Sequence, residues 1–166
     1  MDMQNEKSVL TPKEINARNQ HRETAYVHTM ETEKRHELLF VDYGVNFSFF
    51  RTIAYLMAHP EGAAPSQIAD ELLILRQSMT NIVDTMEGRG LVERLADPKD
   101  RRRIRVRLLP QGQSLGAELL AVEEDYIRRI SKYISNEERA SYHELEQKMY
   151  EAKMAALSEI LAERKA

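Results

Sequence analysis

Apolar residues recur every three or four positions along most of the chain, which is the spacing of amphipathic helices. The repeat formed by Met79, Val83 and Met86 is the clearest, and Gly88 and Gly90 end it. Glycine and proline together number only 11, so breaks should be few and the helices long. The pattern predicts helices over about residues 12–43, 46–59, 66–72, 79–86, 111–133 and 136–163.

Two of these helices begin with a capping box, in which a hydroxyl residue and a glutamate three positions later exchange hydrogen bonds. Thr11 and Glu14 have this spacing, with Pro12 at the first helical position, and Ser135 and Glu138 repeat it before the last helix. The first helix has sparse apolar positions, so it needs a partner surface to be stable. The last helix has an apolar stripe, formed by Tyr142, Leu145, Met149, Ala152, Ala156 and Ile160.

The hydrophobic period changes from 3.6 to 2 after Gly90, which predicts β-strands. A short strand is expected over residues 91–95, and a clearer one over residues 103–108, where apolar residues alternate with three arginines. The segment 97–102 between them is too charged for a core and reads as a loop. Two short helices followed by a hairpin are typical of a winged helix-turn-helix. We therefore predict a mainly α fold with a small β-hairpin wing.

The composition is that of a globular protein without cysteine chemistry. The chain has 166 residues, of which 42% are hydrophobic and 31% charged, and it contains no Cys. Disulfides, thiolate catalysis, zinc–thiolate sites and cysteine-based peroxide sensing are therefore excluded. No apolar stretch approaches the roughly 20 residues of a membrane span, and the first thirty residues contain acidic side chains and no apolar run. We expect no secretory signal, no membrane partner and a cytoplasmic location.

The charge is unevenly distributed along the chain. The total is −3, but residues 76–107 contain nine basic and five acidic residues, a local charge of +4. The remaining residues contain fifteen basic and twenty-two acidic ones, a charge of −7. Because each neutralised phosphate releases counterions, a local basic cluster is more informative than the net charge. An alternating arginine strand is usually a solvated face, but its position after a helix-turn-helix favours contact with DNA.

Several segments resemble the winged helix-turn-helix of the MarR (multiple antibiotic resistance regulator) family of bacterial transcription factors. The most specific pair is Gly-Leu-Val-x-Arg at residues 90–94 followed by Asp-Pro-x-Asp-x-Arg at residues 97–102. The other matching segments are Ile68–Leu72, Met79-Thr80 and Leu108–Gly112. The close match covers about 45 residues. A looser match in the number and order of helices extends it to residues 12–163.

This resemblance implies a homodimeric, ligand-responsive regulator, expected to be a repressor, that binds a pseudo-palindromic operator in double-stranded DNA. The implied organisation is a mobile N-terminus (1–10), an N-terminal dimerisation helix (11–45), a winged helix-turn-helix DNA-binding domain (46–110) and C-terminal dimerisation helices (111–166). No cofactor is expected. An intramolecular helical bundle beside a monomeric DNA-binding module is the alternative for the terminal helices.

The second short helix and the wing hold the candidates for DNA contact. If Met79, Val83 and Met86 face the core, the opposite face carries polar residues that suit the major groove, where Gln and Asn can pair with adenine. In the family, the arginine matching Arg102 probes the minor groove and the aspartate matching Asp100 orients it, which agrees with the attraction of arginine to narrow A·T-rich grooves. The alternative is that these residues meet only solvent, phosphate or one another. The candidate DNA-binding residues are Arg76, Gln77, Ser78, Thr80, Asn81, Thr85, Lys99, Asp100, Arg101, Arg102 and Arg103.

Three positions depart from the family pattern. Ala64 and Leu109 stand where the family commonly has Ser or Thr before a helix, so each helix lacks a side-chain cap that contributes about 1 kcal/mol. Asn81 stands where arginine is frequent, which bears on the operator sequence rather than on the fold.

The aromatic residues gather in one short stretch. All four Phe and Tyr43 lie between residues 40 and 50, and Arg51 follows. Family members of this kind bind small aromatic or phenolic anions between the dimer helices and the winged domain, and an aromatic wall with an arginine suits such an effector. Packing between the first two helices is the alternative reading of each residue. The candidate ligand-binding residues are Tyr43, Phe47, Phe50 and Arg51.

Other functions have less support in the sequence. His28 and His36 lie near Glu33 on the first helix, but without Cys or a tight His pair we expect surface histidines and no metal site. No nucleophile–base constellation, glycine-rich phosphate loop or pair of catalytic acids can be placed, so an enzyme is not expected. The competing function is a winged helix that binds an acidic protein partner through the arginine strand.

Overall fold

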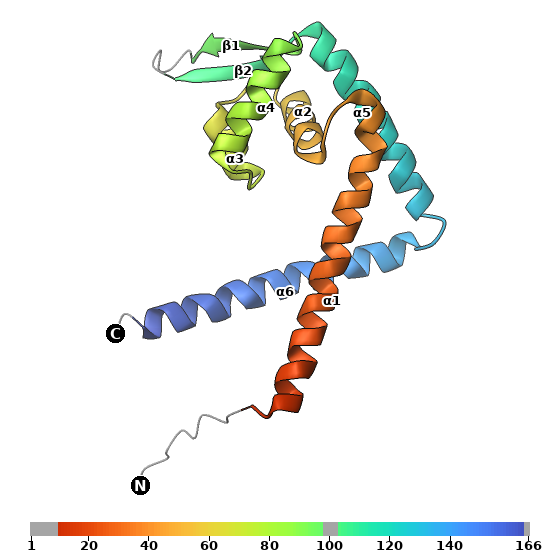
Figure 1. The fold of residues 1–166 in the computed structure, drawn as a ribbon, viewed down its shortest axis with the longest axis vertical. Coiled ribbons are helices and arrows are strands. Elements are labelled where there is room, and N and C mark those ends of the chain that lie inside the picture. Colours follow the sequence, from red (N-terminus) through yellow and green to blue (C-terminus); the bar gives the residue numbers. More distant parts are fainter. Residues whose placement is uncertain (1–9, 98–102, 165–166) are drawn as a thin grey trace. The chain divides into compact units, whose positions relative to one another are not determined.

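The computed structural model describes residues 10–97 and 103–164. Figure 1 shows the elements in order, which are α1 (Pro12–His36), the 3-10 helix η1 (Glu37–Tyr43), α2 (Phe47–Ala58), α3 (Pro65–Glu71), α4 (Arg76–Gly88), β1 (Val92–Ala96), β2 (Ile104–Leu108), α5 (Pro110–Ile130) and α6 (Asn136–Glu163). The predicted helices and both strands are present, so the mainly α fold with a small hairpin is confirmed. The contacts divide the chain into two compact units, residues up to Leu120 and residues from Ala121.

The N-terminal helix is shorter than the sequence pattern predicts. α1 ends at His36, and η1 continues to Tyr43, followed by Gly44 in the left-handed conformation (φ 62°). The tighter 3-10 turn changes which side chains face inward. In η1 the inward residue is Phe40, which is fully buried and stacks on Phe50 with 4.4 Å between the ring centroids. Periodicity alone could not reveal this change, because no helix breaker precedes Gly44.

Both predicted capping boxes are present. The Thr11 hydroxyl accepts a hydrogen bond from the Glu14 N–H (3.3 Å), and the Glu14 carboxylate accepts one from the Thr11 N–H (2.8 Å). Ser135 and Glu138 repeat the arrangement at 3.1 and 2.8 Å. The Thr11 hydroxyl, and then its amide, lowers the pKa of Glu14, while the Ser135 amide, and then its hydroxyl, lowers that of Glu138. These caps therefore stabilise the helices above the ordinary carboxyl pKa and are lost as the pH falls through the lowered pKa.

The helix-turn-helix and the hairpin share one hydrophobic core. β1 and β2 pair in antiparallel fashion with Val92 opposite Leu108. Ala63, just before α3, adds an isolated bridge, in which its N–H donates to the Val106 carbonyl (3.0 Å) and its carbonyl accepts from the Val106 N–H (2.8 Å). The hairpin is thereby anchored to the segment between α2 and α3. The buried apolar side chains of this core include Ile53, Leu56, Ile68, Met79, Val83, Met86, Leu91, Val92 and Val106.

The start of α5 lies against the backbone that leads into the hairpin. The Leu109 N–H donates to the Leu91 carbonyl at 2.9 Å, and Gly112 is buried in the first turn of the helix. A β-carbon built on Gly112 would lie 2.1 Å from the carbonyl oxygen of Leu91, so this close approach requires glycine. Leu109 offers no side-chain cap, and its carbonyl accepts the first helical bond from Gln113 at 2.9 Å.

The helix of the second unit exposes its apolar side chains. None of the residues of α6 is buried in the single chain. A helix with this much apolar surface requires a partner surface. The exposed large apolar residues of α6 are Tyr142, Leu145, Met149, Tyr150, Met154, Leu157, Ile160 and Leu161. None of the helices in the described ranges combines the length and the apolar character needed to cross a bilayer.

Candidate nucleic-acid interface

α4 has one buried face and one polar exposed face. Met79, Val83 and Met86 are at most 1% exposed and pack into the core, as their spacing predicts. The opposite face of the helix is exposed to solvent. The predicted contact residues on this helix are all exposed, namely Arg76, Gln77, Ser78, Thr80, Asn81 and Thr85.

Half of these side chains have unused hydrogen-bonding capacity. Within the described part of the chain, Gln77, Ser78 and Asn81 make no side-chain hydrogen bond. Thr80 and Thr85 instead donate their hydroxyl protons to carbonyls one turn earlier in the same helix, at 3.1 and 2.8 Å. The amides of Gln77 and Asn81 can therefore offer both a donor and an acceptor to an external partner.

Arg76 at the start of α4 forms an ion pair with Asp70 of α3, with 3.0 Å between Nη2 and Oδ2. Both side chains are largely exposed, 72% and 62%. An exposed ion pair of this kind contributes under about 1 kcal/mol to stability, so Arg76 can leave the Asp70 carboxylate and pair with a phosphate at little cost in free energy.

The turn between α3 and α4 carries two exposed leucines. The α3 terminus is a Schellman motif, in which the Ile74 N–H donates to the Ala69 carbonyl (2.9 Å) and the Leu73 N–H to that of Asp70 (3.4 Å). Leu73 adopts a left-handed φ of 53°, which costs about 1 kcal/mol relative to glycine. Leu75 is the N-cap of α4 and makes no capping hydrogen bond, a loss of about 1 kcal/mol relative to Ser or Asp. Neither leucine stands out in the hydrophobic pattern of the sequence.

Arg94 joins the wing to α4. Its side chain is 31% exposed, and its guanidinium forms ion pairs with Asp84 and Glu87, both on α4. Because one arginine contacts two acids on the neighbouring helix, β1 and α4 are fixed relative to each other. Arg94 is the last residue of the Gly-Leu-Val-x-Arg segment, and its place in that motif is the only sign in the sequence of this role.

Two arginines of β2 are used within the domain, which differs from the expectation of a DNA-facing arginine strand. Arg107 donates from Nε to Glu93 on the opposite strand at 3.0 Å. Arg105 donates to the carbonyl of Gly62 and lies 3.9 Å from a carboxylate oxygen of Asp97. Arg107 therefore connects the two strands of the hairpin, and Arg105 connects the hairpin to the segment that precedes α3.

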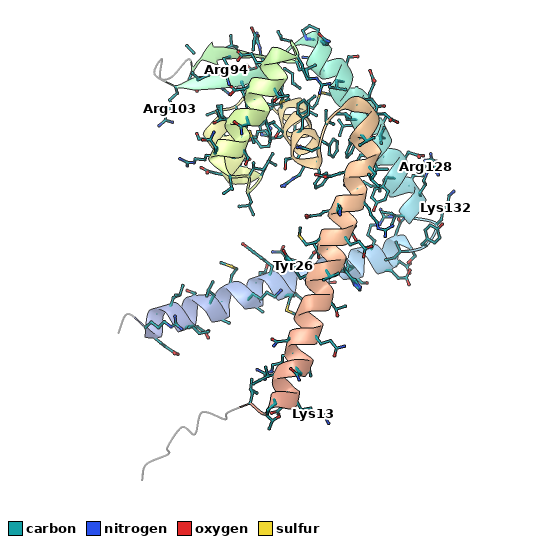
Figure 2. All side chains as sticks on the ribbon, viewed as in Figure 1. Lys13, Tyr26, Arg94, Arg103, Arg128 and Lys132 are labelled. Atoms are coloured by element: carbon teal, nitrogen blue, oxygen red, sulfur yellow. The ribbon has the colours of Figure 1, made fainter. Side chains whose placement is uncertain are left out.

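The third arginine of this segment, Arg103, lies just before β2, at the loop end of the hairpin. Figure 2 shows Arg103 at this end, where its side chain is exposed. The predicted contact residues Lys99, Asp100, Arg101 and Arg102 lie outside the described residues.

A polar cluster fixes α3 against α2. Gln67 donates to the Tyr55 hydroxyl (3.3 Å) and to the Glu71 carboxylate (3.0 Å), and His59 stacks on Tyr55 with 4.0 Å between the ring centroids. Partial burial, and then Glu71, raises the pKa of Tyr55, and Gln67, and then Tyr55, lowers the pKa of Glu71.

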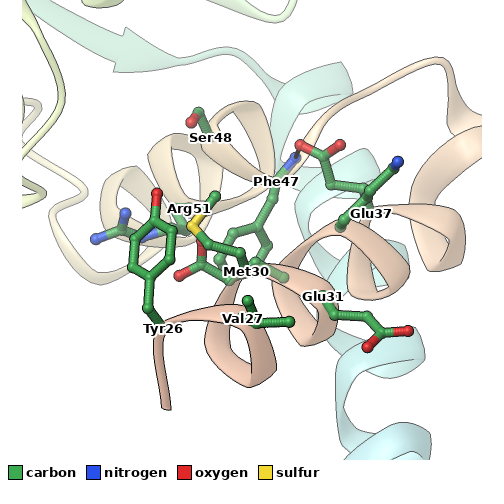
Figure 3. Close-up of a pocket in the computed structure, with 10 residues that line it drawn as sticks. Tyr26, Val27, Met30, Glu31, Glu37, Phe47, Ser48 and Arg51 are labelled. Carbon is green, nitrogen blue, oxygen red and sulfur yellow. Dashed lines mark hydrogen bonds between the residues drawn. The ribbon is translucent and has the colours of Figure 1, made fainter. Parts of the chain in front are cut away.

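An open pocket of about 650 Å³ lies between α1 and the start of α2 (Figure 3). Two of the four predicted ligand-binding residues, Phe47 and Arg51, line it. Phe50 is instead buried against Phe40, and the Tyr43 carbonyl accepts a hydrogen bond from Arg89 (3.1 Å), so neither belongs to the lining. The lining residues are Tyr26, Val27, Met30, Glu31, Glu33, Lys34, Glu37, Phe47, Ser48 and Arg51.

The lining mixes aromatic, acidic and basic groups. Figure 3 shows Tyr26 and Met30 of α1 beside Phe47 and Arg51 of α2. The Arg51 guanidinium lies 5.9 Å from the Phe47 ring centroid and donates to the carbonyl of Leu72, at the end of α3, at 2.8 Å. The sequence analysis did not identify the α1 residues that line this pocket. Tyr26 and Met30 lie one helical turn apart on a helix with few apolar residues, and this spacing could have indicated them.

Among the described residues, no cluster of three or more His, Asp or Glu side chains is placed to hold a metal ion. His36 instead makes edge contacts with Phe47 and Phe40, at 4.8 and 5.6 Å between ring centroids. The aromatic stretch thus packs around this histidine.

Comparison with known proteins places this domain in a family. Residues 43–103 match the model described as MarR family. The chain is similar to two curated HTH-type transcriptional regulators. It is 30% identical over 76 residues to the uncharacterized YsmB of Bacillus subtilis, covering 46% of this chain and 52% of YsmB. It is 27% identical over 108 residues to PrsX of Escherichia coli, covering 64% of this chain and 65% of PrsX. The chain therefore spans about half to two thirds of the length of these relatives.

The fold extends beyond the matched segment. The structure of S. aureus MepR in complex with DNA superimposes with a TM-score of 0.70 at 19% identity, covering 80% of this chain and 96% of that chain. The similarity therefore includes helices on both sides of the matched residues. Taken together, the family match and the two relatives place residues 43–103 in the MarR family, and the chain has the fold of the winged-helix structures of that kind.

Proposed function

We propose that the protein is a transcription regulator that binds double-stranded operator DNA as a homodimer, with α4 in the major groove. The observation that carries this proposal is the exposed polar face of α4, where the side chains of Gln77, Ser78 and Asn81 make no hydrogen bond within the described residues. Polar side chains without partners next to a basic hairpin end suit base edges flanked by phosphates. The function is not catalytic, in keeping with the relatives, which are named as transcriptional regulators.

The side chains have distinct roles in this proposal. Gln77 and Asn81 are suited to bidentate pairing with adenine, while Arg76, Ser78, Thr80 and Thr85 hydrogen-bond to phosphates or base edges. In the wing, Arg102 enters the minor groove and is oriented by Asp100, as the family resemblance implies. Lys99, Arg101 and Arg103 contact phosphates on either side, so the operator should be A·T-rich beneath the wing.

Dimerisation supplies the second half-site. The exposed apolar residues of α6 need a partner, and a second copy of the chain provides one. We propose that residues 11–45 and 111–166 form the dimer and that residues 46–110 form the DNA-binding domain. Two recognition helices about 34–36 Å apart then require a pseudo-palindromic operator. Because the partner is chromosomal DNA, we place the protein in the cytoplasm.

The first test selects binding sites from a random pool of double-stranded DNA and measures affinity for the selected site at several salt concentrations. We expect an inverted repeat, saturable binding and a steep fall in affinity with salt, because several phosphates are neutralised. If the natural partner is an acidic protein instead of DNA, the protein should bind DNA weakly and select no sequence from the pool. That result would favour the competing winged-helix protein-interaction function.

Asn81→Ala is expected to relax sequence selectivity. If Asn81 pairs with adenine, its removal lowers affinity for the selected site by about 5-fold to 100-fold per half-site and leaves binding to scrambled DNA nearly unchanged. The measurement is the ratio of the two dissociation constants, with Asn136→Ala, an exposed asparagine in α6, as the matched control. An unchanged ratio would remove Asn81 from base recognition.

A ligand response, and a role as repressor, are a second part of the proposal and rest on the pocket at Phe47 and Arg51. Arg51 donates a hydrogen bond to the carbonyl of Leu72, which ends α3. An aromatic anion that pairs with the Arg51 guanidinium would replace this hydrogen bond and leave the Leu72 carbonyl without its donor. Such a ligand favours a different arrangement of the helix-turn-helix and lowers operator affinity by population shift. The resulting release from DNA is the behaviour of an inducible repressor.

Benzoate is therefore expected to raise the melting temperature of the protein and to weaken operator binding, and Arg51→Met should abolish both effects. The lining also contains Glu31, Glu33 and Glu37 against Lys34 and Arg51, so benzyltrimethylammonium is the matched probe of opposite charge. Thermal shift and operator titration provide the measurements. A response to the cation alone would assign the pocket to cationic aromatic effectors and overturn the proposed anion.

A further inference from the structure

Leu73 and Leu75 are the most exposed aliphatic side chains of the described residues, at 92% and 78%. They flank Ile74 in the turn that leads into α4. Neither side chain contributes appreciably to the core, so its apolar surface gains little from the folding of this chain.

Both positions also contradict the local preferences of the backbone. Leu73 occupies a left-handed C′ position, where glycine is favoured, and Leu75 occupies an N-cap, where Ser, Thr, Asn or Asp is favoured. Two such departures within one turn, at side chains that stay outside the core, are expected at functional positions rather than structural ones.

The neighbours of this pair indicate what it binds. Leu75 immediately precedes Arg76 and Gln77 on the exposed face of α4, and Asp70 lies on the other side of the turn. A protein interface requires about 800 Å² from each partner, whereas this apolar surface consists of two side chains among charged and polar ones. In the major groove, by contrast, the thymine C5-methyl is an isolated apolar group surrounded by polar edges and phosphates.

We propose that Leu75, extended by Leu73, packs against a thymine methyl group at the edge of each half-site and so determines part of the operator sequence. This inference rests on the proposed DNA-binding function, because it places the leucines beside the bases that α4 reads. The residues are specificity determinants, and their role is separate from the hydrogen bonds of Gln77 and Asn81.

The experiment replaces each thymine of the selected operator, one at a time, by uracil, which removes only the methyl group. For the wild-type protein we expect one thymine per half-site at which this replacement weakens binding about threefold to fivefold, the effect of losing one apolar contact. Leu75→Ser should bind the thymine and uracil operators equally. Uracil at the other thymines is the internal control.

Stability gives an independent readout with the opposite sign. Leu73→Gly and Leu75→Ser restore the preferred residues, so each variant should melt about 3 °C higher than the wild type while binding the operator more weakly. A merely structural role predicts that stability and affinity fall together.

The outcomes separate this inference from the proposed function. If no thymine methyl affects binding while Asn81→Ala still relaxes selectivity, the leucine contact is wrong and the DNA-binding function stands. If Leu75→Ser binds the operator as tightly as the wild type, the inference is likewise overturned. If the wild type selects no DNA sequence at all, the proposed function itself fails.

Discussion

Gly112→Ala is expected to lower the free energy of unfolding by about 3 kcal/mol, at the upper end of the range for overpacking in a protein core. The new methyl group would lie 2.1 Å from the Leu91 carbonyl oxygen, so α5 and the segment entering the hairpin would have to separate. That separation would also strain the hydrogen bond from Leu109 to the same carbonyl. Denaturant unfolding followed by circular dichroism measures the loss.

Two other glycines provide matched controls for this variant. At Gly88, near the end of α4, an added methyl group would meet no atom within 4 Å, so Gly88→Ala should be neutral or slightly stabilising. At Gly116 the methyl would meet the flexible end of Met57 at 2.9 Å, and the expected loss is intermediate. A Gly112→Ala protein as stable as the Gly88→Ala protein would show that the two segments are not held at this close approach.

Met149→Asp is expected to dissociate the proposed dimer. A carboxylate in the middle of an apolar helix interface would lose its water without gaining a partner, which costs several kcal/mol. The dimer dissociation constant should therefore rise more than about 100-fold. Sedimentation analysis across protein concentrations measures this change. Operator affinity should fall with it, because a monomer can occupy only one half-site.

Ala155→Asp is the matched control on the same helix. Ala155 is also exposed, but six residues along an α-helix place it about 120° around the axis from Met149, in the sector that contains Glu144, Lys148 and Glu151. It adds the same charge and should leave the dimer intact. Dissociation by both variants would indicate a loss of α6 helicity instead of a specific interface, and dissociation by neither would place the dimer contacts elsewhere.

α2, α4, α5 and the hairpin were predictable because their hydrophobic periods are strong, whereas α1 and α6 were located by their capping boxes. The repeat of Met79, Val83 and Met86 indicated both the helix and its buried face, and the Ser135 and Glu138 spacing marked the start of α6. The change to a 3-10 helix at Glu37 was not predictable, because it follows from the burial of Phe40 against a ring of another helix. Contacts distant in sequence leave no periodic signal.

The candidate site was predictable only in part, for the same reason. The exposed face of α4 follows from periodicity, whereas the partners of Arg105 and Arg107 depend on strand register and on the backbone of Gly62. An alternating arginine pattern is identical whether the guanidinium groups bind phosphate or cross-strand acids. Leu73 is a further case, since a leucine is not expected in a left-handed turn and only the backbone angle draws attention to it.

The double ion pair of Arg94 with Asp84 and Glu87 has a consequence for how DNA would be measured. Because these ion pairs hold β1 against α4, the strand of the hairpin and the helix proposed to enter the major groove keep a fixed relative position. The distance between a major-groove step and the neighbouring minor-groove step is then fixed by the protein, so inserting a single base pair between them should be tolerated far less well than changing either step.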